Sequence, residues 1–153
     1  MKGLTITILL LLSVAMVNAQ FFKKKINQYD DDGFRKGKWI EYWDKDQQHI
    51  SARGNFEKGD PVGKWLYYHY EGKRRLKFKY QKDRIKVKYY HESGRLDHKG
   101  WARVEYSKKE IHYFWEGIWK YYSPKGKLTR IALYEMGNEK EILFSLDEEE
   151  LAN

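Results

Sequence analysis

The sequence contains no cysteine, only two prolines, and no apolar run long enough to span a membrane. The absence of cysteine excludes a disulfide scaffold, a cysteine-ligated zinc site, a thiol nucleophile and a lipid-anchored bacterial lipoprotein. The longest apolar run, residues 4–17, falls short of the roughly 20 residues that a membrane-spanning helix needs. Both prolines, Pro61 and Pro124, fall where we expect turns.

Basic and aromatic side chains are abundant. The 153 residues include 30 Lys and Arg against 22 Asp and Glu, and they carry 6 Trp, 13 Tyr and 7 Phe. So much ring surface excludes a disordered chain, because the apolar area offsets the entropy lost on folding. Aromatic residues that alternate with charged ones favour β-strands, and the length favours a single domain.

The N-terminus has the pattern of an export signal. Lys2 supplies a positive charge before the apolar run, and Val17-Asn18-Ala19 offers small residues at a cleavage site after Ala19. We therefore predict a signal peptide over residues 1–19 and a secreted or periplasmic protein, with a retained membrane anchor as the alternative. Residues 20–36 form a basic lead-in to the domain.

A repeated segment dominates the rest of the chain. Gly-Lys-Trp-x-x-Tyr-like segments recur at residues 37–42, 63–68 and 117–122, and residues 85–90 fit the same frame with Val87 in the Trp place. Each copy is followed by a turn residue and then by a branched apolar residue that opens a return strand. The turn residues are Asp46, Gly72, Gly94 and Gly126, and the apolar residues are Ile50, Leu76, Leu96 and Leu128. An additional element, with its turn at 107–109, fills the longer gap before Trp119.

Each unit has the two-residue period and the turn glycine of a β-hairpin. A lone hairpin cannot bury its apolar face, so we predict an all-β fold: hairpins stacked into an elongated antiparallel sheet over residues 37–137. Rings would lie on one face and lysines on the other. Residues 138–153 are acidic and would add a strand, a short helix from Ser145 or a solvated tail.

These residues resemble the variant MORN repeat, found in bacterial proteins described as antitoxin-like. The resemblance covers about residues 33–137 and is clearest at 63–80 and 117–134. It implies stacked hairpins that serve protein association or membrane contact, with no catalytic residue to carry over. An antitoxin acts in the cytosol, whereas residues 4–19 would direct this chain outward.

Signatures of catalysis or metal binding are missing from the sequence. The histidines show no metal-ligand spacing, and we expect them on the surface at strand ends; they are His49, His69, His91, His98 and His112. Every glycine is isolated, so there is no phosphate-binding loop, and no serine has a nucleophile-elbow frame. We predict no enzyme activity, no cofactor and no metal.

Basic stretches at residues 73–79 and 82–88 are interleaved with apolar and aromatic residues. They indicate a binding surface for a protein or for an anionic envelope component, either a lipid headgroup or a glycan. Export makes nucleic acid an unexpected partner, and no small-molecule substrate is implied. The candidate contacts are Trp65, Tyr67, Arg74, Arg75, Lys77, Lys86, Tyr89, Trp119 and Tyr121.

Two alternatives stay open at this point. The lysines could serve only to keep the sheet soluble and to protect its edges. In function, the chain could instead be a secreted inhibitor or immunity-type protein that blocks one partner enzyme. The sequence leaves the oligomeric state open.

Overall fold

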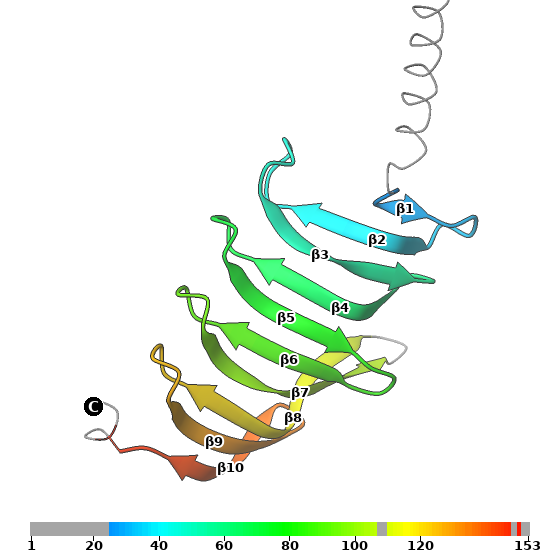
Figure 1. The fold of residues 1–153 in the computed structure, drawn as a ribbon. Helices are drawn as coiled ribbons and strands as arrows, with labels where there is room; N and C mark the ends of the chain where they lie inside the picture. The colour runs from blue at the N-terminus through cyan, green and yellow to red at the C-terminus, as the bar shows by residue number, and fades with distance from the viewer. Residues whose placement is uncertain (1–24, 107–109, 148–149, 151–153) are drawn as a thin grey trace, which may run out of the picture.

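The computed structural model describes residues 25–106, 110–147 and 150. They form one open antiparallel sheet of ten strands, in which every strand pairs with its neighbours in the chain (Figure 1). The strands are β1 (Gln28–Tyr29), β2 (Arg35–Tyr42), β3 (Ile50–Glu57), β4 (Asp60–Tyr68), β5 (Arg74–Tyr80), β6 (Ile85–Tyr90), β7 (Leu96–Tyr106), β8 (Ile111–Tyr122), β9 (Leu128–Glu135) and β10 (Asn138–Ser145). The predicted all-β sheet of stacked hairpins is confirmed.

The hairpin turns that end each repeat lie in a row along one end of the sheet (Figure 1). Three of them share the same hydrogen bonds; in the second repeat Gly72 N–H donates to His69 O, and His69 N–H to Lys73 O. Gly72, at φ +80°, adopts the left-handed conformation that such a turn requires. The first turn is longer, and Gln47 takes the positive φ in place of the expected Asp46.

The sheet extends beyond the predicted repeat domain at both ends. β1 and the start of β2 lie in the lead-in, and β10 occupies residues 138–145. Pro61 lies in β4, opposite Phe56, and not in a turn as expected. It is the second residue of its strand, where the missing N–H is tolerated. The predicted signal peptide, the turn at 107–109 and residues 148, 149 and 151 of the predicted C-terminal helix lie outside the described residues. Ser145 is the last residue of β10 and does not begin a helix.

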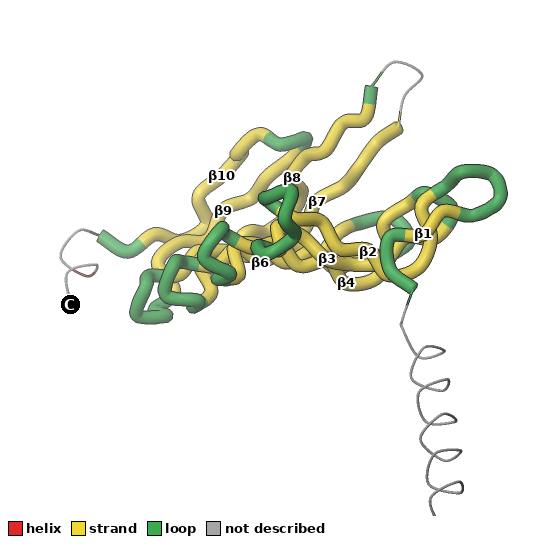
Figure 2. The backbone as a smooth tube through the Cα atoms, turned by 90° about the horizontal axis from the view of Figure 1, so that it is seen from above, coloured by secondary structure: helices red, strands yellow, loops and turns green. Residues whose placement is uncertain are grey.

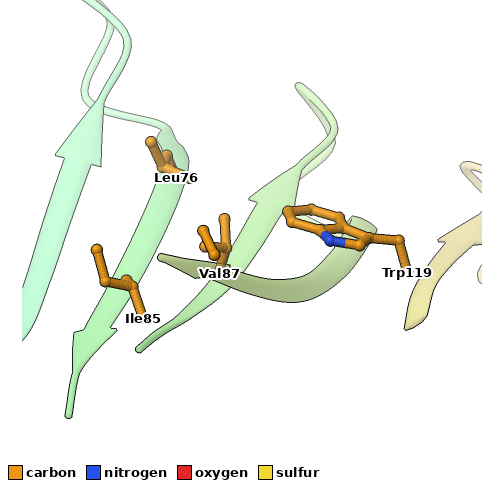
Figure 3. Packing of buried hydrophobic residues seen from close by; sticks show 5 residues of the cluster. Leu76, Ile85, Val87 and Trp119 are labelled. Carbon is orange, nitrogen blue, oxygen red and sulfur yellow. The ribbon is translucent and has the colours of Figure 1, made fainter. Parts of the chain in front are cut away.

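One face of the sheet carries the predicted aromatic ladder. Trp65 lies opposite Phe78, and Phe78 lies opposite Val87, so these three side chains share a face. Most of the core lies on this face, in two clusters of buried residues: Trp39, Ala52 and Trp65 form one, and Leu76, Ile85, Val87, Ala102 and Trp119 form the other. Figure 3 shows the second cluster. Half-buried tyrosines pack around both clusters.

The β7–β8 hairpin is the longest and it covers part of the aromatic face. Its outer half leaves the plane of the sheet (Figure 2). Tyr113 on β8 stacks on Phe78 of β5, with ring centroids 5.9 Å apart, although two strands separate β5 from β8 in the sheet. The element that lengthens the third repeat therefore covers the core. Among the described residues, no helix has the length and apolar character to cross a membrane.

Candidate anion-binding face

The face opposite the aromatic ladder, here called the lysine face, carries Lys64, Lys77, Lys79, Lys86, Lys88, Lys99 and Lys120. Four of these lysines lie directly opposite one another across β5 to β8 and form what we call the lysine row. The pairs are Lys77 with Lys88, Lys88 with Lys99, and Lys99 with Lys120. Beside the row, Lys79 lies opposite both Lys64 and Lys86.

Like charges directly opposite each other destabilise a sheet. None of the seven lysines forms an ion pair within the described part of the chain, where the salt bridges all involve other residues. Glu116 lies opposite Trp101 on this face, but its carboxylate forms a salt bridge with Arg103. Within the part of the chain that the structure describes, the lysine row is therefore a line of cations without a paired carboxylate.

The crowding of cations affects the pKa of Lys77. Partial desolvation lowers the pKa of its ammonium group, and the neighbouring charges of Lys88, Lys64, Arg74 and Lys79 lower it further. Each of these charges favours loss of the Lys77 proton. A bound anion would stabilise the protonated form of Lys77 and raise its pKa again, so the electrostatics at this position favour anion binding.

A shallow cavity of about 220 Å³ lies on this face between the lysines and Trp101. Its lining consists of Lys77, Lys79, Gln81, Lys86, Lys88 and Trp101. Two cations are held at the Trp101 ring: the Arg84 guanidinium at 4.1 Å from the centroid and the Lys86 ammonium at 5.6 Å. The indole thus holds cationic groups beside the lysine row.

A ladder of cation–π pairs lies on the side of the row that is nearer the turns, and one of its cations is Lys99 of the row itself. In three successive repeats, a cation from the return strand lies over the second tyrosine of the next Tyr-Tyr pair. The pairs are Arg53 over Tyr68 at 5.4 Å, Arg74 over Tyr90 at 5.2 Å and Lys99 over Tyr122 at 5.1 Å. Sequence reasoning missed this ladder, although the recurring second tyrosine was the signal for it.

The nine predicted contact residues do not form one surface. Arg74, Lys77 and Lys86 lie on the lysine face. Trp65 and Trp119, at 2% and 0% exposure, are core residues. The prediction that these two indoles are exposed anchors is wrong, because the aromatic face is the buried face of the sheet.

The other four predicted residues belong to the aromatic side. Tyr67, Tyr89 and Tyr121 are half-buried, and Tyr121 shares a hydrogen bond with Tyr134 at 2.8 Å between the hydroxyls. Arg75 is the extra residue of a bulge between β4 and β5, and its charge acts on Tyr67 and Tyr89. The predicted basic and aromatic contacts are therefore separated by the thickness of the sheet.

One histidine differs from the expected surface position. His98 is half-buried between the rings of Tyr89 and Tyr121, at centroid distances of 4.2 and 5.3 Å. Burial lowers its pKa, against the opposing effect of Asp97. In the part of the chain that the structure describes, no three histidine or carboxylate side chains are grouped to hold a metal ion.

In comparisons with known proteins, no family model matches the chain, and no curated protein and no solved structure matches it. The resemblance to the variant MORN repeat therefore stays a prediction, carried by the repeated residues themselves.

Proposed function

We propose that this chain is a non-enzymatic binding module of the cell envelope, whose lysine face holds an anionic macromolecule. The observation that carries the proposal is the lysine row. Lys77, Lys88, Lys99 and Lys120 stand in register on four adjacent strands, and no carboxylate among the described residues pairs with them. An anionic partner would supply the missing charge.

Solubility alone is a poor explanation for this arrangement. A sheet surface is kept soluble equally well by lysines and glutamates that alternate across strands, and such pairs attract each other. Here the cross-strand neighbours Lys77 and Lys88 repel each other, as do Lys79 and Lys86. The arrangement lowers the stability of the free protein, and binding of an anion would recover it.

The sheet also keeps the charges in place. Lys77, Lys88 and Lys99 are half-buried, so part of each side chain is fixed against neighbouring strands. A fixed array of one sign concentrates oppositely charged partners and speeds their association. The predicted export signal would bring this array to the envelope, where anionic glycans and lipid headgroups are exposed.

The proposal is tested by the salt concentration at which the full chain elutes from immobilised heparin, a generic anionic polymer. The variant Lys77→Glu/Lys88→Glu reverses two charges in the row. The control Lys45→Glu/Lys125→Glu reverses two exposed turn lysines and changes the net charge equally. We expect the row variant to elute at markedly lower salt than the control.

Equal shifts in the two variants would overturn the proposal, because retention would then depend on net charge alone. Circular dichroism of both variants checks that the sheet is intact. We expect it to be intact, since one like-charge pair at positions 77 and 88 is only replaced by another, and the glutamate introduced at position 88 also faces Lys99.

A further inference from the structure

The spacing of the lysine row restricts the ligand further than its charge does. Neighbouring strands lie about 4.7–4.9 Å apart, and the row has one lysine on each of β5, β6, β7 and β8. Because the lysines are directly opposite one another, the row runs across the strands without a gap. The Cα atoms of the row therefore follow one another at this interval, and a ligand whose charges repeat at the same interval brings one charge within reach of each lysine side chain.

Linear polymers differ in how well they meet this condition. One sugar ring advances a linear polysaccharide by roughly one strand spacing, so a polymer with a carboxylate on every sugar offers one carboxylate per strand. Successive sugars are turned about the chain axis, and the long, flexible lysine side chains reach carboxylates on either side of the chain. A polymer with a carboxylate on every second sugar reaches only alternate lysines. A lipid surface presents charges in two dimensions and gains nothing from a single line.

We infer that the lysine row binds a linear acidic polysaccharide with one carboxylate per sugar, lying across β5 to β8. The inference rests on the proposed function and names its ligand class. Each carboxylate lies against one lysine, from Lys77 at one end to Lys120 at the other. The twist of the sheet, about 20–25° per strand, makes the bound chain wind gently about its own axis.

The groups beside the row fit the same ligand. Trp101 lies opposite Lys86, next to the row, and its ring holds cationic side chains beside the row. Arg84 and Lys86, held at that ring, add cations on one side. Arg74, held over Tyr90, adds a cation on the other side. A chain in the row is therefore flanked by positive charge along its length.

Binding of galacturonate oligomers to the full chain, measured by calorimetry for lengths from two to eight sugars, tests the inference. We expect the affinity to rise by roughly two- to five-fold per added sugar up to four sugars, as each carboxylate gains an exposed ion pair. Beyond four sugars only a small statistical gain is expected, because the row holds four lysines.

Two variants that remove the same number of charges distinguish the lysines of the row from the lysines beside it. Lys99→Gln/Lys120→Gln shortens the row, so the affinity should stop rising at two sugars. Lys79→Gln/Lys86→Gln removes two lysines outside the row, so the affinity should fall at every length while the rise still continues to four sugars. A rise that ends at the same length in both variants would overturn the inference.

Hyaluronan oligomers of equal charge, with a carboxylate on alternate sugars, should bind more weakly than galacturonate oligomers. Equal affinity, or stronger retention on vesicles of anionic phospholipid, would contradict the ligand class while leaving the anion-binding function intact. Failure to bind heparin, galacturonate oligomers and anionic vesicles alike would instead remove the proposed function itself.

Discussion

The indole of Trp119 lies directly over Gly100, so closely that a Cβ built on this glycine would be 2.3 Å from the indole Cδ2. The indole also donates its Nε1–H to the carbonyl oxygen of Trp101, at 3.1 Å. Trp65 lies over Gly54 in the same way, at 2.2 Å. A glycine in each of these return strands makes room for the tryptophan of the next repeat.

The repeat without a tryptophan also pairs one large and one small side chain at this position. In the repeat where Val87 takes the tryptophan place, the preceding strand carries Phe78 directly opposite it. The large and small side chains have exchanged strands, and Val87 is fully buried. Each repeat thus places one large side chain at this point of the core, but the strand that contributes it differs between repeats.

Substitutions at Gly100 and Trp119 test whether these two positions share one space in the core. Gly100→Phe alone overfills the space beneath Trp119 and should lower the free energy of unfolding by about 1–3 kcal/mol. Trp119→Val alone leaves a cavity and should cost about 3–5 kcal/mol. The double variant reproduces the Phe78–Val87 arrangement, so urea denaturation should give a loss well below the sum of the two. A strictly additive loss would show that the two positions do not share one space.

The lysine row should lower the stability of the free protein. Replacing Lys77 with Met keeps the length of the side chain and removes its repulsion from Lys88 and Lys64. We expect Lys77→Met to raise the free energy of unfolding by about 0.2–1 kcal/mol in urea, and to lower the salt needed for elution from heparin. Lys45→Met, in a turn, should change neither measurement.

The gain from Lys77→Met should also depend on pH. The pKa of Lys77 is lowered in the folded protein, so the unfolded chain holds this proton more tightly. As the pH rises towards about 10.4, the folded wild type loses this proton first and gains stability. The advantage of the variant should therefore shrink over that range, and an advantage independent of pH would argue against repulsion as its cause.

The partly desolvated tyrosines of the aromatic face should make the fold sensitive to alkali. Burial, as the largest effect, raises the pKa of Tyr80, Tyr113 and Tyr121 above the ordinary value. Their stabilising effect is complete below pH of about 10 and is lost as the pH rises further, because only the unfolded chain then ionises them. Tyrosinate absorbance should therefore rise together with the loss of the β-sheet circular dichroism signal.

One variant measures how much a single tyrosine contributes to the loss of stability at high pH. Tyr80→Phe removes one of the groups that ionise only on unfolding, so its stability should fall less steeply with pH above about 10. Ionisation of these tyrosines with an ordinary pKa before the sheet unfolds would mean that the aromatic face is open to solvent.

The repeat pattern predicted the hairpins, the order of the strands and the division into two faces, because strand period and turn glycines are local properties. Which face of the sheet becomes buried depends on contacts between different strands. Trp65 is covered because Gly54 on another strand makes room for its ring, and Phe78 is covered because Tyr113 reaches it from β8. Side-chain exposure could not be predicted from the alternation within one strand.

The position of Arg75 was also beyond the sequence pattern. Strict alternation and an even register would place Arg75 on the face of Lys77 and Lys79, and Arg74 on the opposite face. A bulge between β4 and β5 adds one residue at Arg75, so Arg74 joins the lysine face instead and Arg75 acts on the aromatic side. The row itself depends on the pairing of Lys77 with Lys88 and of Lys88 with Lys99, which becomes visible only with the register.

The location of the bound anion is the central claim, and lysine footprinting tests it most directly. The acylation rate of each lysine in the full chain is measured by mass spectrometry, with and without polygalacturonate. We predict strong protection of Lys77, Lys88, Lys99 and Lys120 by the polymer, and unchanged rates at Lys45 and Lys125. Uniform protection of all lysines, or protection confined to the turns, would contradict binding at the lysine row.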